Sequence, residues 1–142
     1  MLKVFFLAGS FCLLLTSCDV RKKDKQASVS MQQIVKDPTS VQLIDSIYDF
    51  GKVTEGEIVE FSYRFKNIGD KPLVVTNVSA SCGCTVPEKP EAPIKPGEVG
   101  FIKVKFNSQN HPGEAHKTVT VTSNANPPFT ELLLKGEVIG KQ

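Results

Sequence analysis

Two cysteines one residue apart, Cys82 and Cys84, are the residues of this sequence with the clearest capacity for chemistry. They flank Gly83 at the end of a stretch with strand-like composition. Regular pleating would place both sulfurs on one face, with Cα atoms about 6.6 Å apart. This separation lies near the upper limit of about 6.8 Å for a disulfide, and a bend at Gly83 would shorten it. The spacing is therefore compatible with a bridge.

The pair allows three interpretations. Bridged or free, the cysteines can act as small hydrophobic residues at the end of a core strand, which is the interpretation we favour. Two sulfurs on one face also suit copper(I) or zinc. Alternatively, the pair is reducible and exchanges with other thiols. A bridge is expected to persist in an exported protein, but so small a ring would stabilise the fold weakly.

A metal site would need further ligands, and the two histidines are His111 and His116. Both fall in the predicted loop 110–116. A short extra strand near residues 85–87 would bring this loop to the same end of the domain as Cys82, and we expect that strand. Histidines in a hairpin loop are more often solvated than bound to metal, so they are at most helpers.

The N-terminus has the pattern of an exported lipoprotein. Residues 1–17 combine a basic residue, an apolar run from 4 to 15 and small residues before Cys18, as in a secretory signal. The order Leu15-Thr16-Ser17-Cys18 resembles the bacterial lipobox, in which the cysteine is lipidated and becomes the first residue. We expect a signal peptide over 1–17, a lipid-anchored tether over 18–39 and one domain over 40–142.

Composition narrows the classes of function. The chain has 142 residues, 40% of them apolar, which suits one domain, and its formal charge of +2 argues against nucleic acid as a partner. No Ser/His/Asp order stands out and no glycine-rich phosphate loop follows a strand. The acidic residues near the predicted strands are interpreted as solvated: Asp45, Asp49, Glu55, Glu57 and Glu60. We therefore expect no enzyme.

Hydrophobic periodicity predicts an all-β domain. Apolar residues alternate with polar ones over 58–66, 101–106 and 117–122, as in half-buried antiparallel strands. Residues 73–81 are expected to pair with 58–66, residues 41–50 to form one strand or a bent pair, and 130–139 the last strand. The prolines from 87 to 96 suggest a stiff polyproline II connection between two sheets. The pattern predicts an immunoglobulin-like antiparallel β-sandwich of six to eight strands, without its usual tryptophan.

A set of short motifs covers nearly the whole domain. They are YDFGKV at 48–53, EGE at 55–57, FKNIGDKPL at 65–73, SCGCT at 81–85, KPGE at 95–98, FNS at 106–108 and KGEV at 135–138. Together they resemble the family called domain of unknown function 1573. That family is common in Bacteroidota lipoproteins and is similar to the immunoglobulin-like repeats of cilia and centrosome proteins. The resemblance implies fold and location and no particular activity.

We therefore expect a non-catalytic lipoprotein of the bacterial cell envelope that binds another envelope protein or a polymer. Lipid on Cys18 would hold it at the membrane. Residues 19–25 are mostly basic, unlike the acidic residues after the cysteine in surface-bound Bacteroidota lipoproteins, so we expect it to face the periplasm. The alternative is a copper- or zinc-binding or thiol-redox lipoprotein that uses Cys82 and Cys84, with His111 or His116 as helpers.

Overall fold

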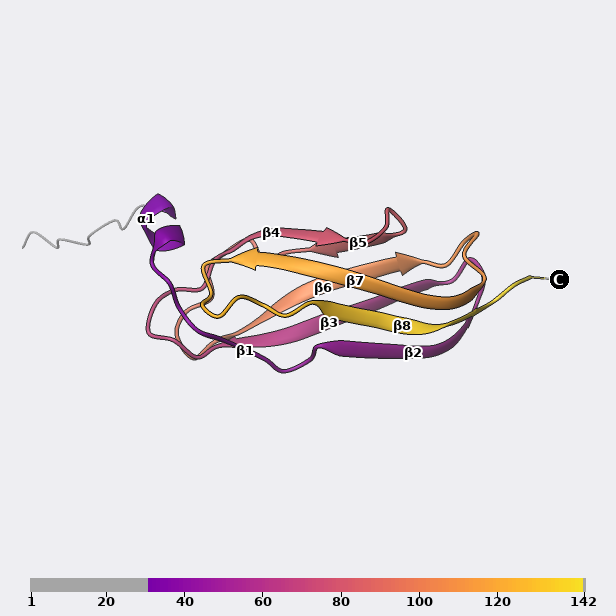
Figure 1. Cartoon of the computed structure of the whole chain (residues 1–142), viewed down its shortest axis with the longest axis horizontal. Helices are drawn as coiled ribbons and strands as arrows, with labels where there is room; N and C mark the ends of the chain where they lie inside the picture. The colour runs from indigo at the N-terminus through magenta and orange to yellow at the C-terminus, as the bar shows by residue number, and fades with distance from the viewer. Residues whose placement is uncertain (1–30, 142) are drawn as a thin grey trace, which may run out of the picture.

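The chain folds into a sandwich of two four-stranded sheets (Figure 1). The structure is a computed structural model and describes residues 31–141. One sheet has the order β1-β3-β6-β5 and the other the order β2-β8-β7-β4. In chain order the elements are α1 Met31–Lys36, β1 Val41–Leu43, β2 Ile47–Thr54, β3 Ile58–Asn67, β4 Val75–Ala80, β5 Thr85–Glu88, β6 Val99–Asn107, β7 Gly113–Ser123 and β8 Leu132–Ile139.

The predicted immunoglobulin-like sandwich is confirmed, with eight strands. Residues 41–50 form the bent pair: β1 lies in one sheet and β2 in the other. The expectation that all strands pair antiparallel is wrong for β2 and β8, which run parallel from Ile47↔Leu133 to Thr54↔Ile139. After the bend, β2 enters the second sheet at the edge beside β8, and the two run in the same direction. No hairpin connects them, so nothing requires antiparallel pairing.

The predicted pairing of residues 73–81 with 58–66 is wrong. β4 pairs with β7 in the opposite sheet, and the neighbours of β3 are β1 and β6. Leu73, Val74 and Val75 are all buried, so this stretch lacks the alternation of a half-buried strand. Leu73 exchanges two backbone hydrogen bonds with Ile94, of 2.9 and 2.8 Å, where the chain crosses between the sheets. A buried crossing and a strand have similar composition, which explains the error.

The predicted role of the proline-rich segment is also wrong. Pro87 lies within β5, and residues 89–98 join β5 to β6. These two strands are antiparallel neighbours in one sheet, so the prolines do not connect the two sheets. Along the described strands, the chain passes between the sheets at residues 44–46, 55–57, 68–74, 81–84 and 108–112.

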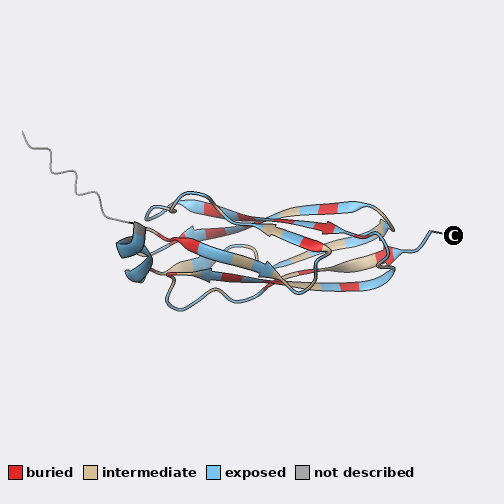
Figure 2. Cartoon of the chain, turned by 90° about the horizontal axis from the view of Figure 1, so that it is seen from above, coloured by how far each residue is buried: buried red, intermediate tan, exposed pale blue. Residues whose placement is uncertain are grey.

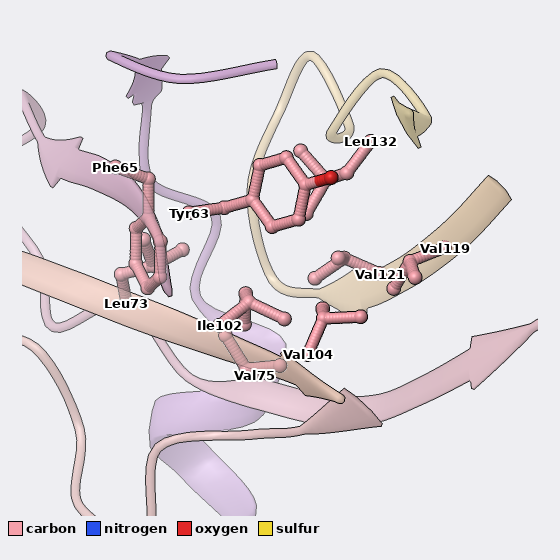
Figure 3. Packing of buried hydrophobic residues seen from close by; sticks show 9 residues of the cluster. All are labelled: Tyr63, Phe65, Leu73, Val75, Ile102, Val104, Val119, Val121 and Leu132. Atoms are coloured by element: carbon pink, nitrogen blue, oxygen red, sulfur yellow. The ribbon is translucent and has the colours of Figure 1, made fainter. Parts of the chain in front are cut away.

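Apolar side chains from both sheets fill the interior (Figure 3). Figure 2 shows the buried residues recurring along the strands, as the sequence predicts for half-buried sheets. The larger cluster consists of Tyr63, Phe65, Leu73, Val75, Ile102, Val104, Val119, Val121 and Leu132. The second consists of Val59, Phe106, Ala115, Leu134 and Val138. Each large side chain buried in this way contributes about 1.5–3 kcal/mol, so the core stabilises the domain without tryptophan.

A buried asparagine joins three segments at the end of the sandwich where α1 lies. The Asn67 side-chain amide donates to the backbone oxygens of Lys71, at 2.7 Å, and Ile94, at 2.9 Å. Its oxygen accepts from the Thr39 hydroxyl at 3.0 Å. Asn67 and Thr39 are both buried, and satisfied buried polar groups hold their segments in one arrangement. The chain therefore enters the sandwich at a fixed point.

The predicted signal peptide and Cys18 lie outside the described residues. Met31–Lys36, within the segment predicted as a tether, forms the short helix α1. Within residues 31–141, no helix has the length and apolar character needed to cross a membrane.

An ion pair between the half-buried Asp45 and the exposed Arg64 links the bend between β1 and β2 to β3. The Arg64 guanidinium donates to both carboxylate oxygens of Asp45, at 2.7 and 3.0 Å, and the Arg64 amide donates at 3.0 Å. These hydrogen bonds lower the pKa of Asp45 below its ordinary value. A carboxyl whose pKa is lower in the folded than in the unfolded state increases the free energy of unfolding at pH values above the unfolded-state pKa. This contribution is lost as the pH falls through the folded-state pKa.

We predict that Asp45→Asn makes the free energy of unfolding less dependent on pH between about pH 5 and pH 2. The measurement is urea unfolding over that range. Asp49→Asn is a suitable control, because Asp49 is exposed and its contact with Lys135 is longer, at 3.6 Å. Equal pH dependence in Asp45→Asn and the wild type would contradict the role given to this pair.

Candidate functional site

The turn between β4 and β5 carries a disulfide between Cys82 and Cys84. β4 ends at Ala80 and residues 81–84 form the turn, so the strand pleating does not continue through the cysteines. The two Cα atoms are 5.4 Å apart, closer than an extended strand would place them. Gly83 is exposed and is not among the glycines with positive φ. The regular pleating considered for the cysteines in the sequence thus stops before them, and the bend that brings them together lies in the turn.

Backbone hydrogen bonds hold this turn from both sides. Ser81 donates its amide to the Thr118 carbonyl at 3.0 Å, and the Thr118 amide donates to the Ser81 hydroxyl at 3.1 Å. On the other side, the Asn107 amide donates to the Cys84 carbonyl at 2.9 Å. Within the turn, the Thr85 amide donates to the Cys82 carbonyl at 3.2 Å. Both sheets thus fix the ends of the turn independently of the sulfurs.

The disulfide borders an open hollow of about 450 Å³. Its walls come from β3, the β4–β5 turn, β5, β6 and the β6–β7 loop. The lining residues are Ile58, Cys82, Gly83, Cys84, Val86, Lys105, Asn107, Gln109 and His111. Ile58 is 63% exposed and Val86 is 55% exposed, so two aliphatic side chains face solvent beside the disulfide. We call this group of residues the disulfide hollow.

The predicted short strand is confirmed as β5, and it brings one histidine to the hollow. His111 lines the hollow, and its ring centroid lies 6.3 Å from that of Phe106. Its Nδ1 lies 2.7 Å from the Gln109 carbonyl. A carbonyl can only accept, so Nδ1 carries the proton.

His116 does not join the hollow. It was expected in a loop, but β7 begins at Gly113, and His116 is exposed on that strand, where it pairs with Lys135 of β8. Among residues 31–141, no group of three or more His, Cys, Asp or Glu side chains is arranged to hold a metal ion. A bridged sulfur is not a thiolate, so the predicted copper or zinc site would require the reduced pair.

The contacts of two residues, Thr85 and Lys117, were not predicted from the sequence. The buried Thr85 places its hydroxyl 3.5 Å from the Cys82 sulfur and 3.8 Å from the Cys84 sulfur. Lys117 places its Nζ 5.7 Å from the centroid of the buried Phe106 ring, and Cys84 packs against the cluster that contains this ring. The adjacency of Thr85 to Cys84 was a usable signal. The place of Lys117 depends on strand register, which composition does not show.

Lys105 supplies the positive charge on the wall of the hollow. It pairs with Glu60 across β3 and β6 at 3.2 Å, and both side chains are largely exposed. A surface pair of this kind contributes about 0–1 kcal/mol and is weakened by salt. The Glu60 carboxylate therefore offsets part of the positive charge beside the disulfide.

A family model described as "Protein of unknown function (DUF1573)" matches residues 41–138. This chain therefore belongs to that family, which confirms the resemblance seen in the sequence motifs. No curated protein gives a significant match.

Solved structures with the same fold belong to proteins of different kinds and from different organisms. A protein of unknown function from Porphyromonas gingivalis W83 has 18% identity and a TM-score of 0.62, and the match covers 72% of this chain and 48% of that one. This chain thus spans about half of that protein. A PapD-like domain of human CEP192 has 12% identity and a TM-score of 0.58, with 73% and 88% covered. The secreted serine protease VesC from Vibrio cholerae has 12% identity and a TM-score of 0.52, with 70% and 23% covered. At these identities the likeness shows the fold alone.

We predict that Gly83→Ala leaves the disulfide intact and changes the free energy of unfolding by no more than about 0.5 kcal/mol. No atom lies within 4 Å of the position of an added Cβ. Gly100→Ala is the matched comparison, because its Cβ would overlap the buried Phe65 ring. Overpacking of this kind costs about 1–3 kcal/mol. Denaturant unfolding and mass spectrometry test both variants, and a large loss in Gly83→Ala would mean that the turn requires glycine.

Proposed function

We propose that this chain is a non-catalytic lipoprotein of the bacterial cell envelope, anchored by lipid on Cys18, and that its domain binds another envelope protein or a polymer. The disulfide hollow is the binding surface. The observation that carries this proposal is the pair of exposed aliphatic side chains, Ile58 and Val86, beside the disulfide at one end of the sandwich.

The position of the hollow suits a membrane-anchored protein. In Figure 1, α1 lies at one end of the sandwich and the β4–β5 turn lies toward the other. The predicted tether precedes α1, so an anchor at Cys18 would hold the α1 end nearer the membrane. The disulfide hollow would then point away from the membrane, toward proteins or polymers of the envelope.

The sheet register explains why the two aliphatic side chains form one surface. On β6, Asn107 is the partner of Ile58, and Lys105 is the partner of Val86. The Asn107 amide also donates to the Cys84 carbonyl at 2.9 Å, which sets the turn beside the same strand end. An apolar patch rimmed by polar side chains is typical of a binding surface. Binding at this surface would not require any of its lining residues to react.

The anchor is tested by Cys18→Ser. We predict that the wild-type chain incorporates labelled fatty acid and sediments with membranes, while Cys18→Ser does neither. The double variant Cys82→Ser/Cys84→Ser keeps Cys18 and should behave as the wild type. Membrane sedimentation and lipid labelling of Cys18→Ser at wild-type levels would contradict lipidation at this residue.

Binding is tested with a photo-crosslinking amino acid at position 86 of the full chain in its native envelope. We predict crosslinks to a protein or polymer that fall at least tenfold when Ile58→Glu is added. Position 120 is the control, because Thr120 is exposed on β7 in the opposite sheet. Equal crosslinking from positions 86 and 120, or no effect of Ile58→Glu in a folded protein, would refute the hollow as the binding surface.

A further inference from the structure

The Cys82–Cys84 disulfide is open to attack from solvent. Both cysteines are half-exposed, and they border the disulfide hollow. Gly83 between them is exposed, with no atom within 4 Å of the position that a Cβ would take. A thiolate must reach a sulfur to exchange with a disulfide, and exposed disulfides are the labile ones. Access of a thiolate to the sulfurs therefore does not limit exchange at this disulfide.

The disulfide contributes little to holding the fold together. It joins residues only two apart in sequence, so it restricts few conformations of the unfolded chain. Hydrogen bonds from Ser81 to Thr118 and from Asn107 to Cys84 already fix the turn to both sheets. The sulfur–sulfur bond can therefore open while β4 and β5 stay paired with their neighbours.

A hydroxyl beside the sulfurs is suited to stabilise a thiolate. The Thr85 hydroxyl lies within 3.5 Å of one sulfur and 3.8 Å of the other, so it can donate to whichever sulfur becomes negative. A hydrogen-bond donor beside the sulfur lowers the pKa of a thiol and makes it a better leaving group.

We propose that this disulfide is a thiol-exchange site that accepts two electrons from a dithiol. A thiolate of the dithiol attacks one sulfur, the bond between Cys82 and Cys84 breaks, and its electron pair leaves on the other sulfur beside Thr85. The second thiol of the dithiol, after losing its proton to solvent, attacks the resulting mixed disulfide. The dithiol ends as a disulfide, and Cys82 and Cys84 take up two protons as thiols. This activity goes beyond binding and does not depend on the partner of the hollow.

The first test measures reduction of the full lipidated chain, in mild detergent, by dithiothreitol. The reference is a peptide of residues 79–87 with the same disulfide, which has the same ring without the fold. We expect the folded chain to be reduced at least tenfold faster than the peptide, with an unchanged circular dichroism spectrum. Reduction no faster than in the peptide, or only after unfolding, would overturn the proposal.

The second test uses Thr85→Val, which keeps the shape of the buried side chain and removes the hydroxyl. We expect reduction to slow at least threefold, while Thr120→Val, on the exposed face of β7, leaves the rate unchanged. A Thr85→Val protein that folds normally and reacts at the wild-type rate would overturn the assigned role of the hydroxyl.

The third test identifies the source of the dithiol. Cys84→Ser leaves a single thiol at Cys82. In the native envelope its thiolate can attack the disulfide form of the dithiol, which is the reverse of the proposed step, and one thiol of the dithiol leaves. The mixed disulfide then persists, because no second cysteine is present to resolve it. A reductant-sensitive protein adduct would identify a protein dithiol, and a small mass increase would identify a small-molecule thiol. No adduct of either kind would overturn exchange in the envelope. All three tests read sulfur chemistry, so loss of crosslinking at position 86 would refute the binding surface without affecting them.

Discussion

The site depends on one constraint, which is that the chain must pass from one sheet to the other between Ala80 and Thr85. Ala80 pairs with Val119 in one sheet, and Thr85 pairs with Phe106 in the other. Only four residues span the step. With both ends fixed by strand pairing, the turn is compact enough to bring the two Cα atoms within disulfide range. The crossing between the sheets therefore brings the two cysteines together, and the disulfide is not what forms the crossing.

The two ends of the sandwich carry different kinds of interaction. At the end near α1, the buried Asn67 joins the β3–β4 and β5–β6 connections and Thr39, and its polar groups are satisfied inside the protein. At the other end, the disulfide hollow leaves Ile58 and Val86 facing solvent. Buried polar groups that make all their hydrogen bonds favour a rigid structure around them. Exposed apolar side chains beside polar ones favour binding of a partner. The chain thus enters the sandwich at one end, and the proposed binding surface lies at the other.

Local patterns predicted the faces of the central strands but not all of their partners. Ile102, Val104 and Phe106 are fully buried, because strict alternation with lysines leaves only one choice of face. The segment beginning at Leu73 was misplaced, since three successive buried residues fit a crossing as well as a strand. The cysteine pair was visible from spacing alone. Thr85, Lys117 and the separation of His111 from His116 depend on where β5 and β7 begin and on their register, which only the folded chain defines.

The central claim is that the sheets, and not the sulfur–sulfur bond, hold the β4–β5 turn in place. Hydrogen exchange of the oxidised and reduced full chain tests it most directly. We predict that the amides of Ser81 and Asn107 keep their protection within about threefold after reduction, with larger changes confined to residues 82–84. Loss of protection along β4 and β5 on reduction would show that the disulfide holds the crossing together, and would contradict this account.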